Sequence, residues 1–130
     1  MKASDSGQLP VQPPLKPLIW IGGSKKDLKA LPEAVVSAFG YGLYLAQCGR
    51  RHAQCKTLRG SGDGSVIEIV EDHVGNSYRA VYTVRFSAAV FVLHVFQKKS
   101  KKGAHTPKPE MELIAARLKR AAEIAKEMAQ

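Results

Sequence analysis

The sequence predicts an α+β fold, with a small, mostly antiparallel twisted sheet and helices packed on it. Three β-prone runs follow one another over residues 65–97 with short turns between them, two helical segments precede them, and one amphipathic segment follows. Such short connections force consecutive strands to pair antiparallel, as a meander. The 130 residues, 45% of them hydrophobic, suffice for one compact domain. We expect it to span residues 16–130, after a flexible, Pro-rich arm at 1–15.

The N-terminal half is expected to contain one strand and two helices. Residues 18–21 form a short apolar run that ends at Gly22-Gly23, which is typical of a strand. Ser24, with Asp27 three residues later, resembles a capping box and predicts a short helix to about residue 30. A second helix is expected from Pro32 to Gly49, although Gly40 and Gly42 each weaken its interior by roughly 1 kcal/mol.

The C-terminal half is expected to contain the meander and a long helix. Residues 50–64 are rich in Gly, Arg, Lys and Ser, which predicts a loop. Strands are expected at 65–71, 78–86 and 89–97, with turns at Gly75-Asn76 and Ser87-Ala88. Thr106 as N-cap and Pro107 at the first position begin the last helix. Its apolar stripe consists of Met111, Ile114, Leu118, Ala121 and Ala125.

The charge balance favours an anionic partner. Lys and Arg total 20 against 11 Asp and Glu, a formal charge of +9, and this makes nucleic acid more natural than a purely solubilising role. Cys48 and Cys55 have neither disulfide-framework nor zinc spacing, which fits a reducing cytoplasm. No apolar run is long enough for a signal or a membrane span, so we expect no membrane association.

Two arginines on the middle strand of the meander are the first candidate site residues. Period-two alternation places Arg79 and Arg85 on one face and apolar residues, including Tyr78 and Tyr82, on the other. Arginine on a rigid strand suits bidentate phosphate binding. The alternative is a cross-strand salt bridge, since Glu68 falls within reach of Arg79 if Glu71 lies opposite Tyr78. Both can hold together.

A lysine-rich segment follows the last strand. Lys98, Lys99, Lys101 and Lys102 lie within six residues that lead to a helix N-terminus, which itself attracts anions. A solvated loop is the alternative for this charge run. His105 is a possible general acid or base, whereas His94 lies in an apolar strand and is expected in the core. No histidines have metal-ligand spacing with a carboxylate, so we expect neither metal nor cofactor.

Several segments together resemble a known family. They are SKKDLKALPEAV, LAQCG, KTLRGSGDGSVIEI, SYRAVYTVRF and VLHVFQKKSKKGAHTPKPEMELIAARLKRA, of which the last two in that order are fairly specific. The chain resembles the phage-derived Gp49-like, HigB-type toxins of the RelE superfamily, from residue 16 to the last helix. The resemblance implies a RelE-like fold and the toxin of a type II toxin-antitoxin system. Such a toxin is a ribosome-dependent mRNA endoribonuclease, inhibited by a helix-turn-helix antitoxin.

The resemblance also implies roles for individual residues. In the family no metal is used: the RNA 2′-hydroxyl attacks its own phosphate while cationic side chains stabilise the developing charge. Arg79 would bind the scissile phosphate, and Lys99 would neutralise the same charge with Lys98 beside it. His105 falls where RelE-like proteins have a catalytic tyrosine. Glu68 stands where they carry lysines, which is a departure from the pattern. The further RNA-binding residues would be Arg85, Lys101 and Lys102.

Two other functions fit the same sequence. A ParE-like toxin of the same fold would poison DNA gyrase and would have no nuclease chemistry. A non-catalytic RNA- or ribosome-binding module would keep the charge without the activity. Cleavage of mRNA on ribosomes, gyrase-dependent DNA breaks and growth arrest on expression distinguish these three functions.

Overall fold

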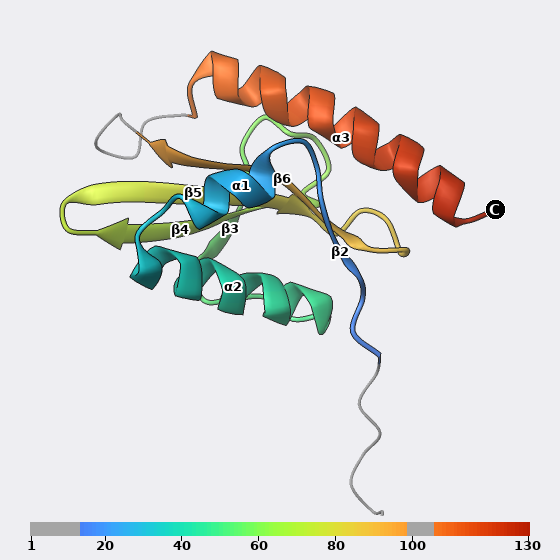
Figure 1. Cartoon of the computed structure of the whole chain (residues 1–130). Coiled ribbons are helices and arrows are strands. Elements are labelled where there is room, and N and C mark those ends of the chain that lie inside the picture. The colour runs from blue at the N-terminus through green and yellow to red at the C-terminus, as the bar shows by residue number, and fades with distance from the viewer. Residues whose placement is uncertain (1–13, 99–105) are drawn as a thin grey trace, which may run out of the picture.

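The computed structural model describes residues 14–98 and 106–130. Within them the elements follow in the order β2 (Leu18–Trp20), α1 (Ser24–Lys29), α2 (Glu33–Gln47), β3 (Cys55–Thr57), β4 (Val66–His73), β5 (Asn76–Thr83), β6 (Val90–Lys98) and α3 (Lys108–Met128). Figure 1 shows α2 on one face of the sheet and α3 on the other. The predicted α+β class is confirmed. No helix in the described ranges is long and apolar enough to cross a bilayer.

The sheet contains the predicted meander at its centre. Its strand order is β2-β6-β5-β4-β3, with β2 parallel to β6 and every other pair antiparallel. Glu71 pairs with Tyr78, the register on which the predicted salt bridge depended. Glu68 therefore lies opposite Val81 and diagonal to Arg79, on the same face of the sheet.

The segment predicted as a loop at residues 50–64 contains a strand. β3 pairs antiparallel with β4 and forms one edge of the sheet. Three residues are too few for an alternating pattern to be recognised in the sequence, and the flanking Gly and Arg residues favoured a loop. The consequence for the site is that Lys56 lies directly opposite Glu68.

Both turns of the meander differ from the prediction. The first consists of Val74 and Gly75, with φ of 48° and 77°, and Asn76 already pairs with His73. Positive φ at both central residues is typical of a type I′ hairpin, whose twist matches that of the strands. The second connection spans residues 84–89, because β5 ends at Thr83 and β6 begins at Val90.

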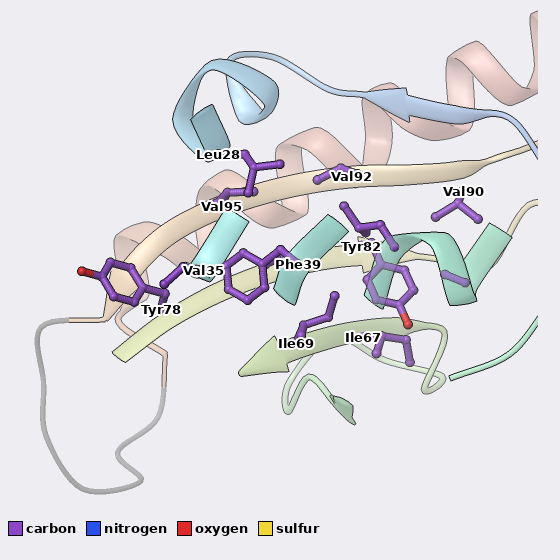
Figure 2. Close-up of a cluster of buried hydrophobic side chains, with 13 residues drawn as sticks. Leu28, Val35, Phe39, Ile67, Ile69, Tyr78, Tyr82, Val90, Val92 and Val95 are labelled. Atoms are coloured by element: carbon purple, nitrogen blue, oxygen red, sulfur yellow. The ribbon is translucent and has the colours of Figure 1, made fainter. Parts of the chain in front are cut away.

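Both faces of the sheet carry an apolar core. Figure 2 shows the core under α2, where Tyr78 and Tyr82 of β5 pack with Phe39, as predicted for that face. The opposite face holds a second core against α3, in which Val81 is fully buried. The Arg79 face is therefore mostly interior, and only part of it is available for a polar site.

The helices follow the predicted periodicity but not the predicted caps. α2 continues through Gly40 and Gly42, and a Cβ at Gly42 would lie 2.8 Å from Ile69 Cδ1, so close packing on the sheet explains this glycine. The predicted side-chain caps are wrong: Ser24 donates to the carbonyl of Val92, and α3 begins after Pro107 without a side-chain cap. The predicted apolar stripe of α3 faces the second core.

Candidate functional site

Arg79 lies in β5, the central strand, and its guanidinium is held by several groups. Its side chain is 7% exposed, and its Nε lies 3.3 Å from Glu68 Oε2. Its Nη1 donates to Ser77 Oγ and, at 3.2 Å, to the carbonyl of Tyr78. The salt bridge considered as the alternative for Arg79 is therefore present. These contacts fix the orientation of the guanidinium, and Nη2 takes part in none of them.

Glu68 connects Arg79 to a second cation on the neighbouring strand. Lys56 Nζ lies 3.7 Å from Glu68 Oε1, and its side chain is 58% exposed while that of Glu68 is buried. Lys56 was missed at the sequence level because its position depends on β3. An isolated lysine in a loop carries no signal, but the same lysine on an edge strand opposite a buried carboxylate extends the charged site towards solvent.

Lys98 completes the group from the other side of β5. It pairs with Ser77 at the end of β6, which places it diagonal to Arg79 on the same face. Although it is a lysine, it is buried to 6% exposure. Burial lowers the pKa of Lys98, the Arg79 charge lowers it further, and the attraction of Glu68 opposes these effects.

We call Lys56, Glu68, Arg79 and Lys98 the basic cluster. It contains three cations and one carboxylate, so a positive excess remains on groups that are partly withdrawn from water. Burial is the main cause of the lowered pKa of Lys98, and the charges of Arg79 and Lys56 lower it further. An anion placed beside Lys98 and Arg79 would offset the repulsion, and the guanidinium fork is suited to phosphate oxygens.

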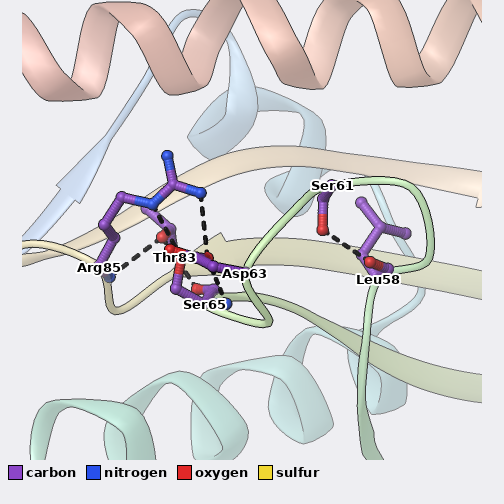
Figure 3. A network of polar contacts seen from close by, with 6 residues as sticks. All are labelled: Leu58, Ser61, Asp63, Ser65, Thr83 and Arg85. Carbon is purple, nitrogen blue, oxygen red and sulfur yellow. Dashed lines mark hydrogen bonds and ion pairs between the residues drawn. The ribbon is translucent and has the colours of Figure 1, made fainter.

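Arg85, expected on the same surface, lies beyond the end of β5 and binds a loop. Its Nε donates to Ser65 Oγ at 2.9 Å, and its Nη2 lies 3.2 Å from Asp63 Oδ1 (Figure 3). Hydrogen bonds from Ser65, and then Arg85, lower the pKa of Asp63 to about 2. The structure thus brings Arg79 and Lys98 together and gives Arg85 partners at the opposite end of the strand.

His94 joins β6 to the first turn of α3. Its Nε2 lies 2.6 Å from Glu110 Oε1, and its ring stacks on Phe96 with centroids 4.6 Å apart. The expected core location of His94 is confirmed by its burial. Its Nδ1 is buried and has no hydrogen-bond partner within the described ranges. His94 lies on the cluster face, with Phe96 between it and Lys98.

Four of the predicted site residues lie outside the described residues. They are Lys99, Lys101, Lys102 and His105, all within 99–105. The chain enters this segment directly after Lys98 and leaves it just before α3. The residues of the Pro-rich arm at 1–13 are likewise outside the described ranges. In the described part of the chain, no group of three His, Cys, Asp or Glu side chains could hold a metal ion.

A comparison with protein families identifies the group to which this chain belongs. The model of the family described as phage derived protein Gp49-like (DUF891) matches residues 26–119, most of the chain and all of the basic cluster. The chain is a Gp49-like protein. Gp49-like proteins are members of the RelE/HigB-type toxin superfamily, and the mixed sheet with three helices is compatible with the RelE-like fold. No curated protein matches this Gp49-like chain.

The family match covers every residue of the basic cluster and the whole lysine-rich segment. It begins inside α1 and ends inside α3, so it includes β3 to β6 and residues 99–105. The resemblance inferred from SYRAVYTVRF and the lysine-rich segment is thereby confirmed at the level of the family. For this Gp49-like protein, membership suggests the toxin of a toxin-antitoxin pair, and hence an antitoxin partner.

Proposed function

We propose that this protein is the toxin of a type II toxin-antitoxin system and that it cleaves mRNA on the ribosome without a metal ion. The observation that carries the proposal is the positive excess of the basic cluster, at the point where the lysine-rich segment begins. Family membership supports the toxin, and the formal charge of +9 supports a polyanionic substrate.

The chemistry is intramolecular attack in the RNA. The 2′-hydroxyl gives up its proton to solvent water as its oxygen forms a bond to the adjacent phosphorus. The bond from this phosphorus to the 5′-oxygen breaks and the 5′-oxygen takes up a proton, which leaves a 2′,3′-cyclic phosphate and a 5′-hydroxyl end. Negative charge builds on the non-bridging oxygens, and preoriented cations stabilise it best when they need no reorganisation. Arg79, fixed by Glu68, would bind the scissile phosphate through Nη2, with Lys98 beside it.

The segment at 99–105 would supply the remaining groups. Lys99 would neutralise the same charge, and His105 would protonate the 5′-oxygen as it leaves. Lys101, Lys102 and Arg85 would contact RNA outside the scissile phosphate; for Arg85 this requires exchange of its Asp63 partner. A helix-turn-helix antitoxin would inhibit the toxin by covering the basic cluster or by preventing entry into the ribosome, and both partners would meet in the cytoplasm.

The reaction is tested on purified ribosomes that carry a defined mRNA. We expect fragments with 2′,3′-cyclic phosphate and 5′-hydroxyl ends, only when ribosomes are present. The same preparation is assayed with DNA gyrase and supercoiled plasmid. Gyrase-dependent DNA breaks without RNA cleavage would assign the protein to the ParE-like alternative. Ribosome binding without either reaction would assign it to the non-catalytic one.

A growth assay tests which residues carry the effect. Expression of the wild-type chain without an antitoxin should halt cells, and Arg79→Ala with Lys99→Ala should restore growth. The matched control is Lys119→Ala with Arg120→Ala, which removes the same two charge types from the exposed face of α3. If both double variants restore growth at equal protein levels, the effect is one of overall charge and the assignment to the basic cluster is wrong.

A further inference from the structure

A second cationic site lies on the opposite face of the sheet from the basic cluster. A hollow of about 350 Å³ is lined by Lys16, Arg50 and Arg51 together with Tyr82 and Ile67. Tyr82 and Ile67 belong to the core under α2 (Figure 2), whereas Arg79 points to the α3 side. The hollow is therefore separate from the proposed catalytic site.

The three cations at this hollow have no acidic partner within the described ranges. No salt bridge joins any of them to a carboxylate, and none of the residues lining the hollow is acidic. Three positive charges around one hollow repel one another, and this repulsion falls when an anion binds between them.

The backbone positions of these cations are fixed by the end of α2. Gly49, with φ of 80°, ends the helix, and the amide of Arg50 donates to the carbonyl of Leu45 at 2.8 Å, the six-to-one bond of a Schellman motif. Gln47 Nε2 donates to the carbonyl of Lys16 at 2.7 Å, and the amide of Lys16 donates to the carbonyl of Gln47. Two segments far apart in sequence are thus held at one rim.

The floor of the hollow is apolar, with one polar atom nearby. Ile67 and Tyr82 are buried, and the Tyr82 hydroxyl lies 3.7 Å from Cys55 Sγ. This volume lies at the lower end of the range for ligand pockets and accommodates one small organic molecule. The rim suits a doubly charged group more than a single carboxylate, because two guanidinium forks and an ammonium can share the oxygens of one phosphate.

We propose that this hollow binds the phosphate monoester of a nucleotide, with the phosphate between Lys16, Arg50 and Arg51 and the nucleoside over Ile67 and Tyr82. The nucleotide could be free or the 5′-phosphorylated end of an RNA, since both present the same chemistry. We call this site the nucleotide pocket.

The test is a titration of the full-length protein with adenosine 5′-monophosphate, followed by calorimetry and by amide chemical shifts. We expect saturable binding that adenosine lacks, with affinity reduced roughly tenfold or more in Arg50→Gln with Arg51→Gln. Val84 lines the hollow and is 37% exposed, so Val84→Glu should abolish binding by repulsion while Val84→Gln retains most of it. These surface changes leave the core intact, which unchanged thermal unfolding would verify.

Further titrations distinguish a free nucleotide from the 5′-phosphorylated end of an RNA. A 5′-phosphorylated RNA tetramer that binds more tightly than both its 5′-hydroxyl form and the free nucleotide would identify an RNA end, and equal affinity of the tetramer and the free nucleotide would identify the nucleotide alone. The proposal is overturned if the nucleotide shows no saturable binding, if inorganic phosphate binds equally well, or if Val84→Glu has no effect. It is also overturned if the pocket variants lose affinity only for an acidic peptide, which would make the hollow a protein-binding site.

Discussion

The charged form of Lys98 is less favourable in the folded protein than in water. Its pKa lies below the ordinary 10.5, so over the interval between the two values the unfolded chain binds more protons at this position than the folded one. The free energy of unfolding should therefore rise with pH through that interval, because stability increases with pH wherever the unfolded state binds more protons.

Replacement of this lysine should consequently stabilise the fold. We expect Lys98→Met to raise the free energy of unfolding at pH 7 by about 0.5–2 kcal/mol, the gain that a single stabilising substitution commonly gives, while RNA cleavage falls. Urea titrations at pH 7 and pH 9.5 measure both effects, since the variant should also lose part of the pH dependence. A lower urea midpoint for Lys98→Met at pH 7 would contradict this account of the charge.

Variants of the Arg79–Glu68 pair distinguish an effect on stability from an effect on activity. Arg79→Met alone deprives the buried Glu68 of its Arg79 partner, and loss of one partner of a buried pair costs about 3–5 kcal/mol. Arg79→Met with Glu68→Met removes both charges, and we expect it to unfold within about 1–2 kcal/mol of wild type. Thermal and urea unfolding of the single and double variants provide the measurement. Equal losses in both would mean that the pair itself stabilises the sheet.

At the scale of the elements, the two glycines of α2 have opposite roles. A Cβ at Gly40 meets nothing within 4 Å, whereas a Cβ at Gly42 would lie 2.8 Å from Ile69 Cδ1. We expect Gly40→Ala to stabilise the protein by about 0.5–1 kcal/mol through helix propensity. Gly42→Ala should destabilise it by about 1–3 kcal/mol through overpacking against β4. Urea midpoints of this matched pair test the assignment, which fails if both shift in the same direction.

The β4–β5 hairpin contains a residue that its turn disfavours. Val74 has φ of 48° and is 83% exposed, and a β-branched side chain is strained in the left-handed region. Asn tolerates this region and, before Gly, is the preferred first residue of a type I′ turn. Val74→Asn should therefore raise the melting temperature by a few degrees, about 1 kcal/mol for a domain of this size. Val74→Thr, which keeps the branch, is the control and should bring no gain.

At the scale of the whole molecule, local patterns predicted the framework and long-range contacts decided the site. Alternation and short turns predicted the meander and the faces of Tyr78 and Tyr82. The salt bridge of Arg79 with Glu68 was an alternative that depended on Glu71 lying opposite Tyr78, and the sheet has that register. Lys56 entered the basic cluster through β3, whose three residues are too short to show a period. Likewise, Lys16 and Arg51 meet at the nucleotide pocket only because the segment before β2 is hydrogen-bonded to the end of α2.

Arg85 lies beyond the point to which strand alternation can predict the face of a side chain. Period-two alternation holds only while the strand continues, and β5 ends at Thr83. Beyond that point the side chain of Arg85 was free to bind Asp63 and Ser65 in the loop after β3. The sheet face of a side chain is therefore predicted least reliably at the end of a strand. Arg79, in the interior of β5, lies on the face that alternation predicted.

The central claim is that preoriented cations on one face of the sheet act on a phosphodiester. Its most direct test is the rate of mRNA cleavage on ribosomes by Arg79→Met with Glu68→Met. The control is Arg120→Met with Glu123→Met, which removes an exposed Arg–Glu pair from α3. We predict that the sheet variant, folded as judged by its unfolding midpoint, loses at least about a hundredfold in rate while the control cleaves as wild type does. Equal rates for the two folded variants would contradict the claim.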